Sequence, residues 1–248
     1  MAKIPKSLSS SKNSQLEFNK RIIEATSDFV CAYKLNLAFY ESAGEHGYET
    51  VHKTLDCIPK EIITIADGKR GDIGNTAEQY AKIIFDDWKF DAATVNPYMG
   101  KDSIEPFIKN EEHCAIILAL TSNPGSHDFQ YLEVSGRPLY EHVVAKAAGW
   151  NVKKNIGLVV GATHPEELKR IRAMVPEMPL LIPGIGTQKG DMEATIRNGC
   201  DKNGSLALIN ISRGIIFASA GDDFAIRARE SAIKIKNEIN SIREKYFG

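Results

Sequence analysis

The sequence predicts an α/β fold, a (β/α)8 or TIM barrel, from three observations. Short apolar runs alternate with helical patterns along all 248 residues, as in parallel strands joined by helices. The apolar runs contain few polar residues, as expected of strands that are buried on both faces. The length is close to the roughly 250 residues of such a barrel. We therefore expect residues 1–248 to form one domain.

The elements follow in order along the chain. A helix near Ser14–Asp28 comes first, and Ser14 with Glu17 forms a capping-box pattern at its start. Seven strands are predicted after it, at Phe29–Leu35, Ile62–Ala66, Ala92–Val95, Ala115–Leu120, Ile156–Val160, Leu180–Ile182 and Leu206–Ile211. Between and after the strands, helices are predicted at Asn75–Asp87 (capping pair Asn75 and Glu78), after Thr163 with Pro165 in the first turn, at Asp191–Asn198 and from Asp222.

Seven strands are one fewer than the barrel needs. Residues 1–13 precede the first helix, contain Pro5 and are rich in Ser and Lys, so they make a poor core strand. We therefore expect the chain to lack the first strand and to begin inside its first βα unit. The Gly-, Pro- and Ser-rich stretch Ser122–Pro138 lies between a predicted strand and a helix, which favours a long active-site loop over a domain boundary.

Composition argues against several functional classes. The chain has 31 Lys and Arg and 32 Asp and Glu, whereas an electrostatic nucleic-acid binder needs a basic stripe. No apolar run approaches the roughly 20 residues of a membrane span, and no secretory signal precedes the first helix. The four cysteines form no CxxC pair and the six histidines show no paired-ligand spacing. We therefore expect reduced thiols, a cytoplasmic location and no metal.

Charged residues follow two of the predicted strands. The segment DGKRGDIGNT begins at Asp67, and alternate side chains of an extended segment share a face, so Asp67 and Lys69 are expected to point the same way. Lys34 lies at the end of the first predicted strand, with Asn36 on the same face, and Asp72 lies at the turn into the next helix. Two lysines and two aspartates would form an alternating network in which all four stay ionised. An ordinary solvated loop is the alternative.

A phosphate site is predicted after the last two strands. PGIGTQKGD begins at Pro183 after the sixth predicted strand, and Ser212-Arg213-Gly214 follows the seventh. Barrels often bind phosphate in these loops, through glycine N–H groups and an arginine. Arg213 is the expected clamp and Gln188 its amide partner, and the alternative is a glycine-rich turn with a structural arginine. The third glycine and the acidic residue of a dinucleotide-binding loop are missing, so that function is rejected.

Six segments together resemble one enzyme family. They are DGKRGDIGNT, NPYMGKDSIEPF (96–107), LTSNPGSHD (120–128), GATHPEEL (161–168), PGIGTQKGD and INISRGI (209–215). In this order they resemble orotidine 5′-phosphate decarboxylase, in the subgroup with an NPYxGxDSxEPF segment. The resemblance implies a cofactor-free decarboxylation of orotidine 5′-monophosphate to UMP, the last step of de novo pyrimidine synthesis.

The resemblance also implies roles for the charged residues. Lys69 matches the proton donor to C6 of the pyrimidine, Asp67 faces the substrate carboxylate, and Lys34 joins the charge network and reaches toward the ribose. Asp72 and Thr76 match residues that enter the active site of the other subunit, so a homodimer with shared active sites is implied.

Further residues match the substrate-binding positions of the family. Asn36 lies beside the charge network, Thr121 and Ser122 match positions near the pyrimidine ring, and Pro183, Gln188 and Arg213 match ring-side and phosphate-binding positions. The family's first strand carries an aspartate that contacts the ribose, and no residue here matches it. Two other functions stay open: a catalytically impaired protein that binds UMP or its precursor, and a related sugar-phosphate decarboxylase, whose relatives usually need a divalent metal.

Overall fold

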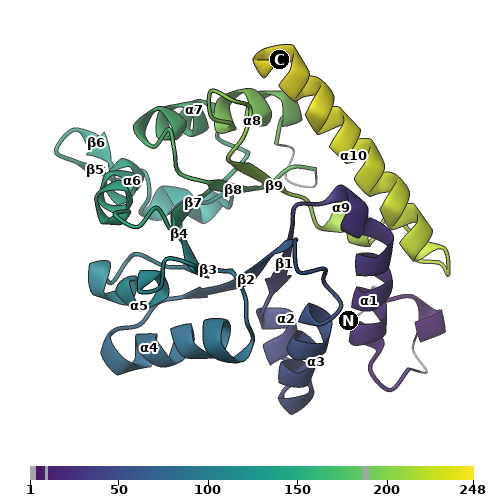
Figure 1. The fold of residues 1–248 in the computed structure, drawn as a ribbon. Helices are drawn as coiled ribbons and strands as arrows, with labels where there is room; N and C mark the ends of the chain where they lie inside the picture. Colours follow the sequence, from purple (N-terminus) through teal and green to yellow (C-terminus); the bar gives the residue numbers. More distant parts are fainter. Residues whose placement is uncertain (1–3, 9–10, 187–189) are drawn as a thin grey trace. The chain divides into compact units, whose positions relative to one another are not determined.

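The computed structural model describes residues 4–8, 11–186 and 190–248 of the chain (Figure 1). They form two compact units. The first consists of Met1–Asp67 and Ile211–Glu238, and the second of Gly68–Asn210 and Ile239–Gly248. Two elements contribute residues to both units: the strand β2 (Ile63–Arg70) and the long helix α10 (Phe224–Phe247).

The first unit holds a parallel strand pair and several helices. Its other elements are η1 (Lys6–Leu8), α1 (Ser14–Thr26), η2 (Ser27–Phe29), β1 (Ala32–Asn36), α2 (Ala38–Glu41), α3 (Glu45–Leu55) and α9 (Arg213–Ile216). β1 pairs with β2 in parallel, in a register that sets Asn36 opposite Asp67. An apolar cluster joins the two segments of this unit, and its buried members are Leu8, Phe18, Ile22, Phe224 and Ala228.

Helix α1 is capped by a different residue from the one predicted. The N-cap is Asn13, whose Oδ1 accepts a hydrogen bond of 3.0 Å from the backbone N–H of Leu16. The Ser14 hydroxyl instead donates to the carbonyl oxygen of Leu8. The predicted capping box was therefore wrong by one residue, because Ser14 is already inside the helix and its side chain binds the preceding turn.

The second unit contains most of the parallel sheet and the helices between its strands. Its elements are α4 (Gly74–Lys82), η3 (Ile83–Asp87), β3 (Ala92–Val95), η4 (Lys101–Ser103), α5 (Glu105–Ile108), β4 (Cys114–Leu120), η5 (Pro124–Asp128), β5 (Glu133–Val134), β6 (Arg137–Pro138), α6 (Leu139–Trp150), β7 (Ile156–Val160), α7 (Pro165–Met174), β8 (Leu180–Pro183), α8 (Met192–Gly199) and β9 (Ala207–Asn210). Strands β3, β4, β7, β8 and β9 pair in this order, all in parallel. Because β7 is buried along its whole length, its apolar run does not alternate.

All seven predicted core strands are confirmed. β3 and β7 have the predicted bounds, and the end points of the other five shift by up to four residues. β2 runs on to Arg70, so Asp67 and Lys69 lie inside the strand rather than after it. In residues 4–8 and 11–13, the part before α1 that the structure describes, no strand is present. Helix α4 begins at Gly74, and its N-cap Ile73 makes no side-chain capping bond, so the predicted cap at Asn75 was wrong.

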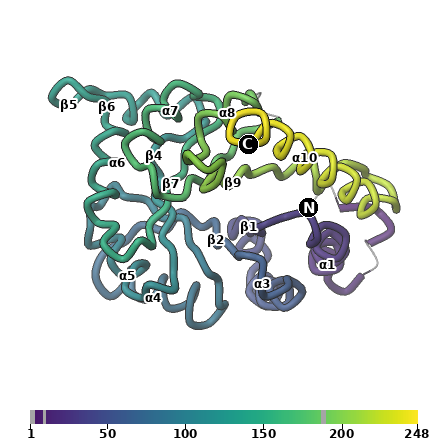
Figure 2. Tube along the Cα trace, turned by 45° about the horizontal axis from the view of Figure 1, so that its top comes forward, coloured from purple at the N-terminus to yellow at the C-terminus, as the bar shows by residue number. Residues whose placement is uncertain are grey.

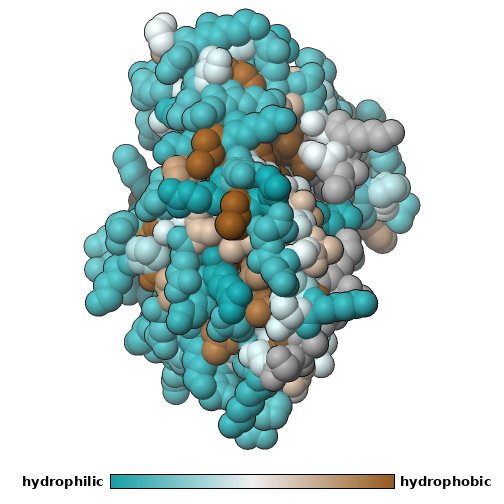
Figure 3. All heavy atoms as spheres, turned by 90° about the vertical axis from the view of Figure 1, so that its right-hand side faces the viewer, coloured by the Kyte–Doolittle hydropathy of each residue, from teal (hydrophilic) through white to brown (hydrophobic). Residues whose placement is uncertain are grey.

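The predicted long loop after β4 contains a short antiparallel hairpin, β5–β6. Figure 2 shows this hairpin at the edge of its unit, next to α6. Within the described parts of the chain, no helix is both long and apolar enough to cross a membrane. On the face drawn in Figure 3, hydrophilic residues predominate and apolar ones form small separate groups.

Candidate active site

A buried ion pair lies on the two strands of the first unit. Lys34 on β1 places its Nζ 2.5 Å from Oδ2 of Asp67 on β2. The side chains are only 13 % and 8 % exposed, so little water competes with the attraction between the two charges. The structure thus brings together two of the predicted site residues, one from the middle of β1 and one from the second half of β2. The carboxyl ends of these parallel strands, the edge where such folds place their chemistry, lie two to three residues further along.

Two further predicted residues belong to the same unit. Asn36 ends β1 opposite Asp67, and its Oδ1 accepts a hydrogen bond of 3.2 Å from the backbone N–H of Ala38. This bond closes a turn at the start of α2 and fixes the Asn36 side chain. Arg213 is exposed and begins the short helix α9, three residues beyond β9 along the chain.

Lys69 has an unusual backbone conformation. Its φ is 47°, in the left-handed region that few residues other than glycine adopt. Its N–H donates a hydrogen bond of 3.0 Å to Oγ1 of Thr94, a buried residue of β3. Such backbone strain persists only where neighbouring structure holds it, and it is often found at functional sites. The regular alternation from which we predicted one direction for Asp67 and Lys69 does not hold at Lys69.

Asp72 and Thr76 lie where the chain turns from β2 into α4. The turn comes close to Asn96, since a Cβ added at Gly71 would lie 3.2 Å from the Cβ of Asn96. Asp72 is half-buried and its Oδ1 accepts a hydrogen bond of 2.8 Å from the next backbone N–H, while Thr76 is exposed in the first turn of α4. Thr76 therefore lies at the surface of the chain, and Asp72 is partly exposed.

Thr121, Ser122 and Pro183 come together at one edge of the sheet in the second unit. Gly161, the first residue after β7, donates a backbone hydrogen bond of 2.8 Å to Leu120, which ends β4. Its neighbour Ala162 donates one of the same length to Pro183, which ends β8. The glycine is required here, because a Cβ at Gly161 would lie 2.9 Å from the Cα of Ser122. The loops after β4, β7 and β8 are therefore packed against one another.

The described residues on either side of the gap at 187–189 in the chain after β8 lie close together. Gly190 donates a backbone hydrogen bond of 3.2 Å to Gly184, and a Cβ at Gly190 would lie 2.8 Å from the Cβ of Ala162. The two ends of the loop are thus held beside the end of β7. The predicted phosphate-site residue Gln188 falls outside the described residues.

Sequence reasoning missed three residues that shape these loops. The Thr94 hydroxyl accepts a hydrogen bond from the backbone N–H of Lys69. Gly161 has no side chain and so leaves space for Ser122. Gln130, in the long loop, accepts a hydrogen bond from the backbone N–H of Thr121. The only signal in the sequence was the position of Thr94 and Gly161 next to strand ends, and nothing marked Gln130.

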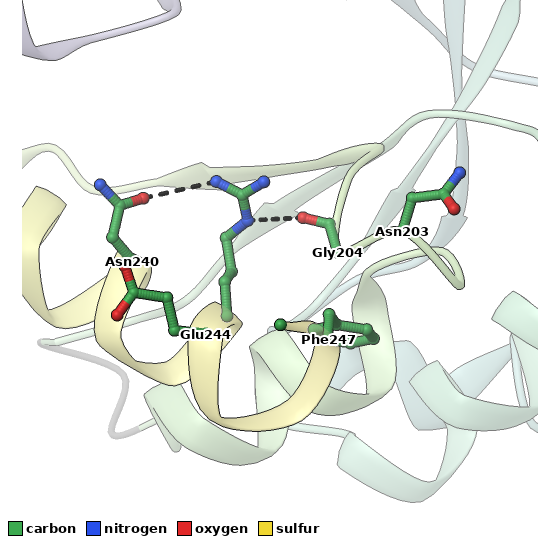
Figure 4. Close-up of a pocket in the computed structure, with 7 residues that line it drawn as sticks. Asn203, Gly204, Asn240, Glu244 and Phe247 are labelled. Atoms are coloured by element: carbon green, nitrogen blue, oxygen red, sulfur yellow. Dashed lines mark hydrogen bonds between the residues drawn. The ribbon is translucent and has the colours of Figure 1, made fainter.

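A pocket of about 340 Å³ at the end of α10 (Figure 4) has a structural explanation. Arg243 Nε donates a hydrogen bond of 2.6 Å to the carbonyl oxygen of Gly204, and Nη1 donates to Oδ1 of Asn240. The Arg243 guanidinium therefore links the end of α10 to the loop before β9 by a hydrogen bond. Among the residues that the structure describes, no group of three or more His, Cys, Asp or Glu side chains could hold a metal ion.

Comparisons with known proteins agree with this arrangement. Residues 12–227 match the model of the family described as "Orotidine 5′-phosphate decarboxylase / HUMPS family". The orotidine 5′-phosphate decarboxylase of Dehalococcoides mccartyi is 54 % identical over 237 residues, which cover 94 % of this chain and 88 % of that protein. The protein of the same name from Flavobacterium johnsoniae is 46 % identical over 100 % of this chain and 91 % of its own.

A solved structure shows the same fold. The OMP decarboxylase of Leishmania donovani superposes with a TM-score of 0.86 at 39 % identity, over 97 % of this chain and 91 % of that one. This likeness confirms the predicted (β/α) barrel fold class. With a family model that matches most of its length and relatives that share about half of its residues, the chain belongs to the orotidine 5′-phosphate decarboxylase / HUMPS family.

Proposed function

We propose that the chain decarboxylates orotidine 5′-monophosphate to UMP without a cofactor, as one cytoplasmic (β/α) barrel domain. The buried pair of Lys34 and Asp67, two residues before the strained Lys69, carries the proposal within this family. It supplies opposite charges that are shielded from water, and Lys69 follows Asp67 two positions later along β2. A reaction that generates a carbanion needs such fixed charges.

Lys69 is the proposed proton donor. When the bond between C6 and the carboxylate breaks, CO2 leaves and the electron pair stays on C6 of the pyrimidine. The carbanion is very basic, so an ammonium group held against C6 lowers the barrier electrostatically and then transfers its proton to C6. The left-handed backbone of Lys69, held by the Thr94 hydroxyl, supports a role that needs a fixed starting point for this long side chain.

Asp67 and Lys34 are proposed to act as one charged group. Asp67 faces the carboxylate of the substrate, and Lys34 holds Asp67 ionised and reaches toward the ribose. Because Asp67 is buried and its Oδ2 is in contact with Lys34 Nζ, its charge is poorly screened. The charge disfavours the bound carboxylate relative to the transition state, in which that charge has begun to leave.

The remaining predicted residues are proposed to bind the substrate. Arg213 and Gln188 bind the phosphate, and this remote binding helps to hold the reacting carboxylate in place. Thr121, Ser122 and Pro183 lie along the pyrimidine, and their gathering at one sheet edge supports this assignment.

We propose a homodimer in which Asp72 and Thr76 complete the active site of the partner subunit, next to the partner's copies of Lys34 and Asn36. The position of Asp72 and Thr76 at the start of α4, where Thr76 is exposed, supports their reaching a second copy.

The test is the absorbance of orotidine 5′-monophosphate during incubation with the pure protein. We expect Lys69→Ala to abolish turnover but to keep UMP binding, while Lys60→Ala, which removes an exposed lysine just before β2, turns over at the wild-type rate. Tight UMP binding by the wild type without turnover, or turnover of a non-nucleotide substrate only with a divalent metal, would contradict the proposal.

A further inference from the structure

Thr121, the first residue after β4, is held by the side chain of Gln130. The Thr121 backbone N–H donates a hydrogen bond of 2.8 Å to Gln130 Oε1, and Gln130 Nε2 donates one of 2.9 Å to Thr121 Oγ1. One amide group thus binds both the main chain and the side chain of a single residue. The Thr121 hydroxyl has two acceptors, Oδ1 of Asn123 at 2.7 Å and Oε1 of Gln130 at 3.3 Å. Its side chain is therefore held by both neighbours.

His164 binds the same residue from the other direction. Its Nε2 lies 3.2 Å from the carbonyl oxygen of Thr121, and because a carbonyl only accepts, Nε2 must carry the proton. The other ring nitrogen, Nδ1, lies 3.1 Å from the Tyr131 hydroxyl. Tyr131, from the long loop, thereby orients the imidazole of His164, the N-cap residue of α7, whose side chain makes no capping bond to that helix.

The part of the long loop that supplies these groups is itself well held. Gln130 donates a backbone hydrogen bond of 2.9 Å to Ser126 and accepts one of 3.0 Å from the N–H of Tyr140 in α6. The Tyr131 ring stacks on His127, with centroids 4.4 Å apart, and meets Tyr140 edge-on at 5.7 Å. Gln130 and Tyr131 therefore belong to a well-packed part of the loop, whereas the hairpin that follows them is exposed.

These contacts converge on the loop proposed to lie along the pyrimidine. Ser122 follows Thr121 directly and is pressed against Gly161, where no side chain would fit. The N–H, hydroxyl and carbonyl oxygen of Thr121 are each hydrogen-bonded. These bonds restrict the conformation of Thr121 and so the starting point of Ser122.

We propose that Gln130 is a positioning residue for the pyrimidine subsite, and that His164 with Tyr131 supports it from the opposite side. The inference rests on the proposed function. Gln130 acts through Thr121 and Ser122 and does not touch the reacting atoms. Losing its two hydrogen bonds should allow the loop after β4 to adopt several conformations, of which one binds the base. The loss of affinity should then affect the contacts to the pyrimidine and not those to the phosphate.

The test compares Gln130→Ala with Glu133→Gln, an exposed position in the hairpin of the same loop. We expect Gln130→Ala to raise the KM for orotidine 5′-monophosphate and the Kd for UMP by about tenfold each, as for the loss of one net hydrogen bond. The Kd for ribose 5-phosphate, which lacks the base, should stay within about twofold of wild type. Glu133→Gln should match wild type in all three measurements.

A second variant guards against a folding defect. Gln130→Glu keeps the acceptor for the Thr121 N–H and loses only the donor to its hydroxyl, so it should fall between wild type and Gln130→Ala. Equal weakening of UMP and ribose 5-phosphate, or unchanged KM and Kd in both variants, would overturn the inference. A wild-type protein without turnover would refute the proposed function, and the paired Kd values for UMP and ribose 5-phosphate would still decide the role of Gln130.

Discussion

Removing the cation of the buried pair should damage stability and activity in different ways. At 2.5 Å the attraction between Lys34 and Asp67 amounts to about 7 kcal/mol for an effective dielectric constant near 20, most of it offset by the desolvation of both groups. Lys34→Met keeps the apolar stem but leaves the carboxylate at 8 % exposure without this cation. We expect a loss of about 3–5 kcal/mol in the free energy of unfolding, the range for breaking one side of a buried pair.

The double variant separates the two effects. Lys34→Met with Asp67→Asn removes both charges, so its free energy of unfolding should return to within about 1 kcal/mol of wild type, a coupling of a few kcal/mol between the two sites. Its kcat/KM should not return, because catalysis needs the charges themselves. We expect each single variant and the double variant to lose at least about 100-fold in kcat/KM, as for other preorganised charged groups.

Urea unfolding followed by circular dichroism, together with the absorbance assay, measures both quantities on the same preparations. Destabilisation of the double variant by the sum of the two single variants would show that the pair is not coupled. Wild-type kcat/KM in Lys34→Met would refute the role given to this charge. Either result would contradict the reasoning from the buried geometry.

Three further predictions concern packing and titration. Arg172 is buried and donates hydrogen bonds to several backbone carbonyl oxygens around α7 and α8. Arg172→Met should therefore lower the free energy of unfolding by about 3 kcal/mol. The control Arg170→Met, at a side chain that is 59 % exposed, should change it by under about 0.5 kcal/mol. Gly161→Ala should raise the KM for the substrate about tenfold, because the added Cβ would clash with the backbone after β4. The control Gly149→Ala in α6 adds a Cβ with no atom within 4 Å. It should leave the KM unchanged and stabilise the helix slightly. Burial raises the pKa of Tyr40 to about 12, above its unfolded value near 10, so its contribution to stability is present below pH 10 and is lost as the pH rises toward 12. Between pH 10 and 12 the free energy of unfolding of Tyr40→Phe should therefore fall less steeply with pH than that of wild type, by a slope that corresponds to about one proton. Equal slopes, measured by urea unfolding at several pH values, would contradict this prediction.

The sequence predicted the bounds of the strands best where a strand is buried along its whole length, as in β3 and β7. Runs such as Ile156–Val160 need no alternation to be recognised when both faces are covered, and β3 and β7 were predicted with their observed bounds. The helix caps were harder to predict. Asn13 and Ser14 are both good capping residues, and only the path of the chain decides which of them lies outside the helix.

The parts of the candidate site that escaped prediction depend on contacts between residues far apart in the sequence. Lys34 and Asp67 were recognisable as charges at strand ends, but their direct contact depends on the register of β1 with β2. The left-handed backbone of Lys69 has no local signal, since its partner Thr94 lies 25 residues away. The hydrogen bonds of Gln130 to Thr121 likewise need the fold of the loop between them.

The most direct test of the account follows the proton that reaches C6. The wild-type protein in D2O should convert orotidine 5′-monophosphate to CO2 and UMP with one deuterium at C6 per turnover, because the Lys69 ammonium exchanges its protons with the solvent before it delivers one. Proton NMR should show the loss of the C6 proton signal of UMP, and Lys69→Ala should form no UMP. UMP without deuterium at C6, or UMP formed by Lys69→Ala at the wild-type rate, would contradict the central claim that Lys69 protonates the carbanion.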